Sequence, residues 1–421
     1  MQATATTEFV IQPNGPLSGR IEISGAKNSV LKLMAATTMA RGHHTLYNVP
    51  EIDDVSVMCR LLESMGASTE RRPGVVEIEI GDLEPVAPFE LVGQVRASTA
   101  LLGPLLGTYG RVELGLPGGD DFGHRPVDMH LKGLEVLGAT FETSGDGIFG
   151  RCEQLTGGEV QLAFPSVGAT ENILMAAVRS NGVTTIENAA REPEIADLVS
   201  YLNKMGARIT GSGSSTLRII GVDQLEAVTH RVIPDRIQAA TFLAALGVAG
   251  GEIVLEGARY DHMDMLCQKF GEMGLRISPD RDGMWAMRSE RLSAVDLSTL
   301  PYPGVATDYK PFLVAALTLA TGTSIVTENL FSGRFRYVDE LVSLGATVRT
   351  DGHHAVIKGV ERLHGGEVIS HDIRAGAALI VAALGADGTT IVRDTGHVAR
   401  GYPDLAGDLR ALGANVVERP I

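Results

Sequence analysis

The pattern of hydrophobic and polar residues repeats six times along the chain. Each repeat closes one segment with a hydrophobic residue, a glycine and a small or apolar residue. The glycines of this motif, spaced by 72, 68, 68, 71 and 68 residues, are Gly66, Gly138, Gly206, Gly274, Gly345 and Gly413. Glycines that follow an alanine-rich apolar run and precede a β-branched one form a second set, Gly42, Gly110, Gly182, Gly251, Gly322 and Gly388. A repeat near 70 residues exceeds the usual solenoid unit, so each copy predicts a βαβ-type module.

The copy from Ser166 to Ile220 illustrates the predicted elements. In order, they are an apolar helix from Ser166 to Asn181, a strand over 183–187, an amphipathic helix from Glu192 to Gly206, and strands over 208–210 and 217–220. Pro193 suits the first turn of the second helix, and Gly206 suits its C-terminal end. Alternating strands and helices with glycine-closed loops predict an α/β fold with mixed sheets, and six copies divide naturally into two sets of three.

The composition narrows the classes of function. The 421 residues are 44% hydrophobic and carry a net charge of −15. This charge disfavours a general nucleic-acid or membrane-surface role, because phosphate backbones need clustered Lys and Arg. A small anionic ligand needs only a local basic pocket. With no apolar stretch of transmembrane length, no signal-peptide pattern and three isolated cysteines, we expect a cytoplasmic protein.

The first helix of each copy begins near a charged or hydroxyl residue. Ser and Asp cap helices routinely, which is our interpretation of Ser98 and Asp235. Cations are different, because the positive end of a helix dipole disfavours them unless an anion neutralises them. The cations at predicted helix starts are Lys27, Arg96, Arg236 and Arg374. Together they predict a pocket for a polyanion.

Several short motifs occur in order between Phe9 and Val417. The first half holds Ile23-Ser-Gly-Ala-Lys27-Asn28, Arg96-Ala-Ser98, Leu116-Pro-Gly-Gly-Asp120-Asp-Phe-Gly-His-Arg125-Pro-Val-Asp128, Ser166-Val-Gly-Ala-Thr170 and Ala190-Arg-Glu-Pro-Glu194-Ile195. The second half holds Pro234-Asp-Arg236, Thr307-Asp308, Asp372-Ile-Arg374-Ala375 and Arg400-Gly-Tyr402. In sequence and order, these motifs resemble those of the UDP-N-acetylglucosamine enolpyruvyl transferase family.

The resemblance implies the enolpyruvyl transferase fold, an α/β fold of two inside-out α/β barrel domains, each of three repeated βαβ-type modules. This agrees with the six copies counted from the glycines. By resemblance, residues 23–233 form one domain, with a mobile catalytic loop near residues 116–125. Residues 1–22 plus 234–421 form the other, and the active site is expected in the cleft between them.

The family moves the enolpyruvyl group of phosphoenolpyruvate to the 3-hydroxyl of UDP-N-acetylglucosamine and releases phosphate, as the first committed step of peptidoglycan synthesis. It uses no metal or organic cofactor. The chemistry is addition followed by elimination: C3 of phosphoenolpyruvate is protonated, the sugar oxygen attacks C2, and the tetrahedral intermediate loses a C3 proton and expels phosphate. This path needs an acid, a base, and cations for a carboxylate and a phosphate. The resemblance therefore implies phosphoenolpyruvate and a uridine nucleotide as partners.

The resemblance also assigns roles to individual residues. The residues expected to bind phosphoenolpyruvate are Lys27, Asn28, Arg125, Arg374 and Arg400. Asp120, Asp308 and Lys27 are the expected catalytic residues, with Asp308 as the base. The residues expected to contact the nucleotide are Arg96, Arg125, Pro126, Val127, Asp128, Met129, Phe164, Pro165, Ser166, Val167, Gly168, Asp308 and Leu330. Glu192 and Glu194 match a family motif too, but we interpret them as a charged helix start.

One departure from the family pattern concerns the loop. Most members carry a cysteine after the paired glycines, where this chain has Asp120. Gly-Gly-Asp-Asp also suits an ordinary polar turn. The carboxyl can act as the acid if desolvation raises its pKa when the loop closes. Asp121 is the neighbouring candidate. Because the epoxide fosfomycin alkylates a thiol and a carboxylate is a much poorer nucleophile, we expect fosfomycin resistance.

A second departure concerns the acceptor. The family's Phe-Pro-Thr-Asp, with a Gln two residues later, reads Val305-Ala-Thr307-Asp308-Tyr309-Lys310 here, and Ala399 replaces a common Asp before Arg400. Beside the sugar site, Tyr309 and Lys310 would shrink the site or offer a new phosphate contact. UDP-N-acetylglucosamine remains the first prediction. The alternatives are a paralogue acting on UMP in nucleoside-antibiotic biosynthesis and a non-catalytic nucleotide-binding paralogue.

Overall fold

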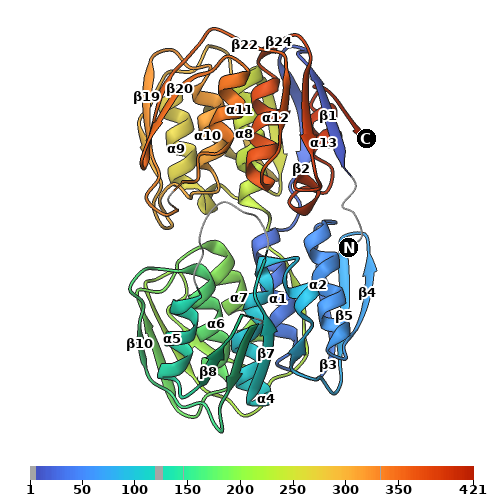
Figure 1. Ribbon diagram of the computed structural model, residues 1–421, viewed down its shortest axis with the longest axis vertical. Coiled ribbons are helices and arrows are strands. Elements are labelled where there is room, and N and C mark those ends of the chain that lie inside the picture. Colours follow the sequence, from blue (N-terminus) through green and yellow to red (C-terminus); the bar gives the residue numbers. More distant parts are fainter. Residues whose placement is uncertain (1–5, 119–126, 146, 332) are drawn as a thin grey trace. The chain divides into compact units, whose positions relative to one another are not determined.

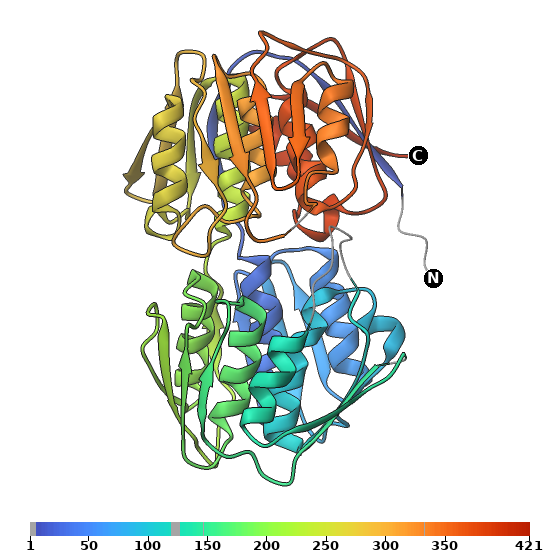
Figure 2. The same ribbon diagram turned by 60° about the vertical axis from the view of Figure 1, so that its left-hand side comes forward.

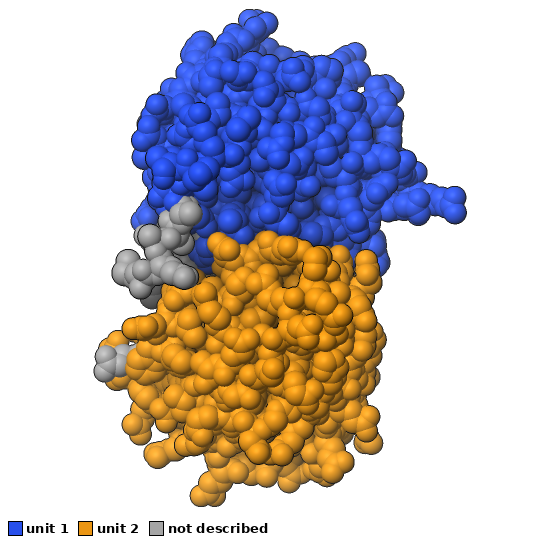
Figure 3. All heavy atoms as spheres, turned by 90° about the vertical axis from the view of Figure 1, so that its right-hand side faces the viewer, with its two compact units in different colours: residues 1–24, 120–124, 234–421 blue, residues 25–119, 125–233 orange. Residues whose placement is uncertain are grey.

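The chain folds into two compact units, coloured separately in Figure 3. The computed structural model describes residues 6–118, 127–145, 147–331 and 333–421. Of these, residues 6–24 and 234–421 belong to unit 1, and residues 25–118 and 127–233 belong to unit 2. No helix in the described ranges is long and apolar enough to cross a membrane.

Each unit has three four-stranded sheets among its described residues. The strands of unit 2 are β3 (Gly42–Tyr47), β4 (Ser68–Arg72), β5 (Val75–Ile80), β6 (Val86–Ala87), β7 (Arg111–Gly115), β8 (Thr140–Thr143), β9 (Gly147–Arg151), β10 (Glu159–Gln161), β11 (Val183–Glu187), β12 (Arg208–Thr210), β13 (Thr216–Ile220) and β14 (Thr229–Arg231). The strands of unit 1 are β1 (Thr7–Gln12), β2 (Leu17–Glu22), β15 (Gly251–Glu256), β16 (Arg276–Asp280), β17 (Gly283–Arg288), β18 (Leu297–Ser298), β19 (Thr323–Thr327), β20 (Thr347–Asp351), β21 (His354–Lys358), β22 (Leu363–His364), β23 (Glu367–Ile369), β24 (Ala386–Asp387), β25 (Thr390–Asp394) and β26 (Asn415–Pro420). Strands β22 and β24 form a further two-stranded sheet.

All six four-stranded sheets share one topology. Their orders are β14-β3-β5-β4, β6-β7-β9-β8 and β10-β11-β13-β12 in unit 2, and β2-β15-β17-β16, β18-β19-β21-β20 and β23-β25-β1-β26 in unit 1. In each sheet the first pair of strands is parallel and the other two pairs are antiparallel. The mixed sheets expected from the repeat are therefore confirmed.

Two kinds of helix accompany the sheets. The amphipathic helices that follow the second strand of each sheet are α2 (Asp53–Ser64), α5 (Asp128–Val136), α7 (Pro193–Lys204), α9 (Asp264–Met273), α11 (Tyr337–Ser343) and α13 (Leu405–Ala411). The inner helices are α1 (Lys27–Thr37), α4 (Leu102–Tyr109) with the 3₁₀ helix η1 (Arg96–Leu101), and α6 (Val167–Val178) in unit 2, and α8 (Arg236–Ala249), α10 (Lys310–Leu317) and α12 (Ile373–Ala383) in unit 1. Short helices α3 (Phe89–Val92), η2 (Tyr260–His262) and η3 (Val398–Arg400) complete the described elements.

The inner helices form the core of each unit. In unit 1, α8, α10 and α12 contact one another, and every residue of α10 and α12 is buried. Figures 1 and 2 show these three helices side by side with the sheets around them. In unit 2, α6 contacts both α4 and η1, and η1 contacts α1. Helices that are apolar on every side need such complete enclosure, which explains the alanine-rich runs of the sequence.

The sheets are completed by strands from distant parts of the chain. Strand β1 lies between β25 and β26, so the N-terminal segment supplies the fourth strand of the last module. Strand β2 pairs in parallel with β15, and β14 pairs in parallel with β3. The chain ends of unit 1 are thereby held in its sheets.

The repeated glycines have the conformation that their positions require. All twelve have positive φ, between 72° and 114°. Gly206, for example, follows the C-cap residue Met205 of α7 and has a φ of 110°, a left-handed backbone that favours glycine. The predicted helix starting at Arg96 is different. It begins as η1, and Ser98 does not cap it, because its hydroxyl donates to the carbonyls of Val92 and Val95. The capping interpretation of Ser98 is wrong.

Phe9 and its neighbour test the role of β1. Phe9 is 2% exposed in the core of unit 1, whereas Val10 points to the other side of the sheet and is half-buried. Phe9→Ala should therefore destabilise unit 1 by about 3–5 kcal/mol, and Val10→Ala by much less. Urea unfolding of each variant, monitored by hydrogen exchange of the backbone amides of α12, measures both changes in the free energy of unfolding. Equal effects of the two substitutions would contradict this placement of β1.

Candidate active site

In unit 1 the starts of the three inner helices meet. Asp235 and Asp372 cap α8 and α12, because each carboxylate accepts hydrogen bonds from two backbone N–H groups of its helix. The capping interpretation of Asp235 is confirmed. Nη1 of Arg236, at the start of α8, donates to the Tyr309 hydroxyl just before α10 at 2.8 Å. Charged and polar side chains from three buried helices therefore share one region.

Asp308 lies among three guanidinium groups. Nη2 of Arg334 donates to its Oδ1 at 2.8 Å, with Arg334 3% exposed and the Asp308 side chain 26% exposed. Burial alone would raise the pKa of Asp308, but the charges of Arg334, Arg374 and Arg236 outweigh burial and hold the pKa well below its usual range. The predicted base is thus an ionised carboxylate in the ligand-free chain.

Arg374, in the first turn of α12, contacts the residues that follow Arg400. Arg374 is buried, and its guanidinium carbon lies 5.8 Å from the ring centroid of Tyr402. The Tyr402 hydroxyl in turn lies 2.7 Å from that of Thr241 in α8. An added Cβ on Gly401 would lie only 2.3 Å from Cγ2 of Ile373 and in van der Waals contact, at 3.6 Å, with Nη1 of Arg374. Arg400, at the end of η3, is thus next to a residue that contacts Arg374.

Lys310, the first residue of α10, is buried in an ion pair. It is 0% exposed, with its Nζ 2.9 Å from Oε2 of Glu328, which is also 0% exposed. Burial lowers the pKa of Lys310 to about 8, although the charge of Glu328 opposes this shift. Tyr309 is buried as well. Of the two alternatives left open by the sequence, a smaller sugar site or a new phosphate contact, the burial of this ammonium disfavours the phosphate contact from Lys310. Leu330 lies nearby and donates its N–H to Glu328 at 2.8 Å.

In unit 2, Lys27 is the first residue of α1 and is paired inside the protein. Its Nζ lies 2.8 Å from Oδ2 of Asp54 in the first turn of α2, and both side chains are buried. Asn28, the next residue, is half-buried. A protein carboxylate therefore supplies part of the negative charge that this cation needs at a helix start.

Arg96, His130 and the start of α6 form a second group in unit 2. Burial is the largest cause of a lowered pKa for His130, and the positive charges of Arg96 and Lys32 lower the pKa further, to about 4. The His130 ring is therefore neutral near pH 7, and its Nδ1 accepts a hydrogen bond from Nδ2 of Asn172 at 2.8 Å. An added Cβ on Gly168 would lie only 2.8 Å from Cε1 of His130. The first turn of α6 thus packs directly on this imidazole.

The segments expected to contact a nucleotide lie at two helix starts of unit 2. Ser166 caps α6 and accepts a hydrogen bond from the Ala169 N–H at 3.3 Å. Phe164 is exposed, and Pro165, Val167 and Gly168 are half-buried. At the start of α5, Asp128 is exposed and lies 3.4 Å from Nζ of Lys132, while Val127 and Met129 are half-buried.

A group of carboxylates lies beside the inner helices of unit 2. Glu171 of α6 is buried with its Oε2 2.9 Å from Nζ of Lys32. Burial raises the pKa of Glu171 against the effect of Lys32, and the charges of Glu194 and Glu192 raise it further. Glu194 is buried at the start of α7, so it is part of an internal charge group as well as of a helix start.

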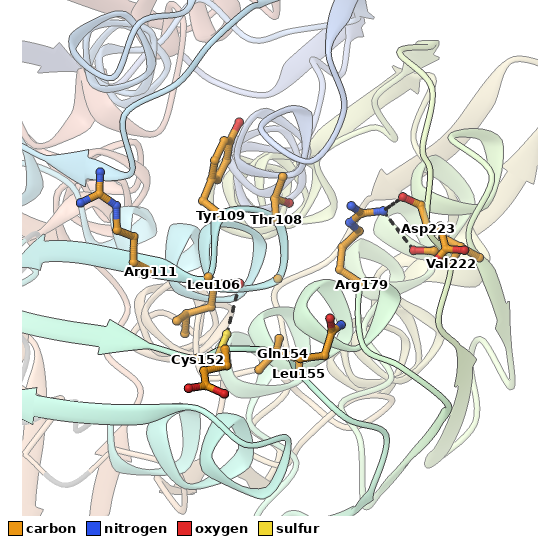
Figure 4. A pocket seen from close by; sticks show the side chains of 13 residues that line it. Leu106, Thr108, Tyr109, Arg111, Cys152, Gln154, Leu155, Arg179, Val222 and Asp223 are labelled. Carbon is orange, nitrogen blue, oxygen red and sulfur yellow. Dashed lines mark hydrogen bonds between the residues drawn. The ribbon is translucent and has the colours of Figure 1, made fainter.

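Several predicted site residues lie outside the described residues. These are Asp120, Asp121, Arg125 and Pro126. A pocket of about 480 Å³ in unit 2 holds none of the predicted site residues. It lies at the C-terminal end of α4, where Arg179 donates to the carbonyls of Val222 and Asp223 (Figure 4).

Sequence reasoning missed the partners of the predicted residues. Asp54, Glu328 and Arg334 each hold a predicted residue or its neighbour in place, yet none belongs to a motif quoted above. Asp54 resembles an ordinary acidic helix start, and Arg334 follows a glycine in a polar connection. Residue type and spacing carry no signal that these side chains turn inward.

Comparisons with known proteins identify relatives over nearly the whole chain. The family model described as EPSP synthase (3-phosphoshikimate 1-carboxyvinyltransferase) matches residues 11–409. UDP-N-acetylglucosamine 1-carboxyvinyltransferase 1 of Caldanaerobacter subterraneus subsp. tengcongensis is 44% identical over 98% of this chain and 100% of its own. The UDP-N-acetylglucosamine 1-carboxyvinyltransferase of Nocardia farcinica is 48% identical over 98% of each chain.

A solved structure extends the comparison to the fold. The enolpyruvyl transferase NikO from Streptomyces tendae superposes with a TM-score of 0.90 at 25% identity, covering 99% of this chain and 100% of its own. The enolpyruvyl transferase fold predicted from the sequence is confirmed.

Gly168 provides a test of the geometry at the start of α6. Gly168→Ala should destabilise unit 2 by about 1–3 kcal/mol, because the new methyl group overlaps the buried His130 ring. Gly145→Ala is the matched control, since an added Cβ there meets nothing within 4 Å. Denaturant unfolding of each variant, and of the double variant with His130→Ala, gives the coupling energy. Additive effects of Gly168→Ala and His130→Ala would contradict the contact.

Proposed function

Because the chain belongs to the UDP-N-acetylglucosamine 1-carboxyvinyltransferase family, within the wider EPSP synthase family, we propose that it transfers the enolpyruvyl group of phosphoenolpyruvate to the 3-hydroxyl of UDP-N-acetylglucosamine and releases phosphate. The observation that carries this proposal is the 44% to 48% identity over nearly the full length of relatives with that name. The proposal includes peptidoglycan synthesis as the purpose of the reaction and a cytoplasmic location.

Phosphoenolpyruvate is bound in this proposal by Lys27, Asn28, Arg125, Arg374 and Arg400. A lysine is a point charge and an arginine is a planar fork, so together they suit a phosphate and a carboxylate. The buried positions of Lys27 and Arg374 support these roles, because a cation in a poorly hydrated site interacts more strongly with a ligand anion. The ion pair with Asp54 lowers the free-energy cost of burying the Lys27 ammonium before phosphoenolpyruvate binds.

Asp308 is the proposed base that accepts the proton of the sugar hydroxyl. Its low pKa keeps it ionised at neutral pH, as a proton acceptor must be. The same low pKa makes it a weak base, since an efficient catalytic base titrates near the working pH. We propose that bound phosphoenolpyruvate attracts Arg374 toward its own anionic groups, which raises the pKa of Asp308 when the base is needed.

The uridine nucleotide is held mainly by residues of unit 2 in this proposal. Backbone N–H groups of Val167 and Gly168 at the start of α6 suit a diphosphate, because the first N–H groups of a helix have no partner within the helix. Phe164, Pro165 and Ser166 precede them. Arg96, Arg125, Pro126, Val127, Asp128 and Met129 complete this set, and Asp308 and Leu330 come from unit 1. The reaction therefore depends on residues of both units.

A phosphate-release assay tests the proposed function and its acceptor together. With phosphoenolpyruvate and UDP-N-acetylglucosamine, the chain should release phosphate and form a nucleotide sugar heavier by one enolpyruvyl group. UMP is the comparison acceptor, and mass spectrometry identifies the product. Turnover with UMP but not with UDP-N-acetylglucosamine would overturn the acceptor, and no turnover with either would overturn the function.

Asp120 is the proposed acid that protonates C3 of phosphoenolpyruvate. Asp120→Asn should abolish turnover, because an amide does not donate a proton in the same way. Asp120→Cys should keep activity and become sensitive to fosfomycin, to which the parent should be resistant. Phosphate release with and without fosfomycin measures both effects, and Asp121→Asn is the control. Full activity of Asp120→Asn would move the role to another residue.

Asp308→Ala should lower kcat by about a hundredfold or more, the usual scale for loss of a general base. Nucleotide affinity, measured by isothermal titration, should change much less. A large rise in the nucleotide Kd with unchanged kcat would instead make Asp308 a binding residue.

A further inference from the structure

Lys310 contacts both ends of one connecting segment of unit 1. The described residues of this segment, 328–331 and 333–335, follow β19 and include Leu330 and Arg334. The Lys310 ammonium pairs with the Glu328 carboxylate at the start of the segment at 2.9 Å. At the other end it donates to the carbonyl of Arg334 and lies 3.8 Å from the ring centroid of Phe335. The Lys310 side chain therefore binds both ends of the segment to the first turn of α10.

The Glu328 carboxylate is a centre of hydrogen bonds. It accepts from the hydroxyls of Thr299 and Thr307, each at 2.7 Å. It also accepts from the N–H groups of Leu330 at 2.8 Å and Phe331 at 3.2 Å. Glu328 therefore links Thr299, the residue before Asp308, and the backbone of Leu330 and Phe331.

The segment places the guanidinium of Arg334 on the residues before α10. Nη1 of Arg334 donates to the Thr307 hydroxyl at 2.9 Å, and Nη2 donates to Asp308 at 2.8 Å. Lys310 binds the backbone carbonyl of Arg334, and the side chain of Arg334 binds Asp308. A shift of this segment would move the guanidinium relative to the carboxylate.

We propose that Lys310 is a positioning residue, whose buried ion pair with Glu328 and hydrogen bond to the Arg334 carbonyl keep the Arg334 guanidinium in contact with Asp308. The inference rests on the proposed function, in which Asp308 is the base. Stability alone does not account for the pair, because burying two charges costs about as much solvation as their attraction returns, and apolar replacements are often neutral or stabilising. Fixing a geometry is a better-supported use of such a pair.

The charged groups around Lys310 and Glu328 determine how the loss of this ion pair would affect the pKa of Asp308. Lys310 faces Glu328, Arg334 and Asp372, and the Tyr337 phenol is buried among Arg334, Asp372 and Glu328. Asp308 faces Arg334, Arg374 and Arg236. If Arg334 is no longer held in place, Asp308 loses the cation that contributes most to its low pKa, and that pKa should rise.

Neutralising one or both partners separates positioning from stability. Lys310→Met and Glu328→Gln each leave one buried charge without its partner and should lower Tm. The double variant has no charge at either position, so its Tm should return toward the parent value. Its kcat should nevertheless stay about ten- to a hundredfold below the parent, as expected for a reacting group displaced by about 1 Å. KM for phosphoenolpyruvate should change little.

A second measurement does not depend on turnover. Carbon-13 NMR of labelled aspartates, with the Asp308 signal identified by its loss in Asp308→Asn, follows the titration of this carboxyl. In the double variant its pKa should rise above the parent value. Arg362→Met with Asp387→Asn, which removes an exposed ion pair of unit 1, is the control and should change neither kcat nor this pKa.

The outcomes distinguish this inference from the proposed function. If kcat recovers together with Tm in the double variant, or if the pKa of Asp308 is unchanged, Lys310 has only a structural role. If the parent itself releases no phosphate, the proposed function fails, and the titration of Asp308 still decides the role of Lys310.

Discussion

The inner helices lie largely inside each unit, and their buried residues include the first residue of α8, α10 and α12 in unit 1 and of α1 in unit 2. Charged side chains at those starts are therefore buried, and a buried charge is costly unless other groups compensate it. The structure meets this constraint with specific partners. Asp54 compensates Lys27, Arg334 compensates Asp308, and Glu328 compensates Lys310. Much of the candidate site follows from this need.

Compensation by fixed partners suits the proposed chemistry. Charges that are already oriented and poorly hydrated stabilise a developing charge without waiting for water to reorganise. Asp308 shows the cost, since the arginines that orient it also make it a weak base in the ligand-free chain. A ligand that redistributes those arginines would convert an oriented carboxylate into an effective base at the moment of reaction.

The sequence predicted the fold and the helix starts because both leave local signals. Gly206 and its equivalents mark positive φ after a helix, and the alanine-rich runs mark helices buried on all sides. The partners left no such signal. Glu328 and Arg334 reach the start of α10 from a segment about 20 residues later in the chain, and only tertiary packing brings them there. The same holds for Lys310, since its position beside Asp308 in the sequence does not reveal that its side chain turns into the core.

Solvent deuterium tests the central claim most directly. If the chain protonates C3 of phosphoenolpyruvate and then eliminates phosphate, each turnover adds one solvent hydrogen to C3 and removes one of the three hydrogens of the resulting methyl group. The reaction run in D₂O with UDP-N-acetylglucosamine should therefore give an enolpyruvyl product with deuterium in its vinyl methylene group, detected by mass spectrometry and proton NMR. If neither the product nor the recovered phosphoenolpyruvate carries deuterium at that carbon, and the rate in D₂O equals the rate in H₂O, the protonation of C3 assigned to this site is contradicted.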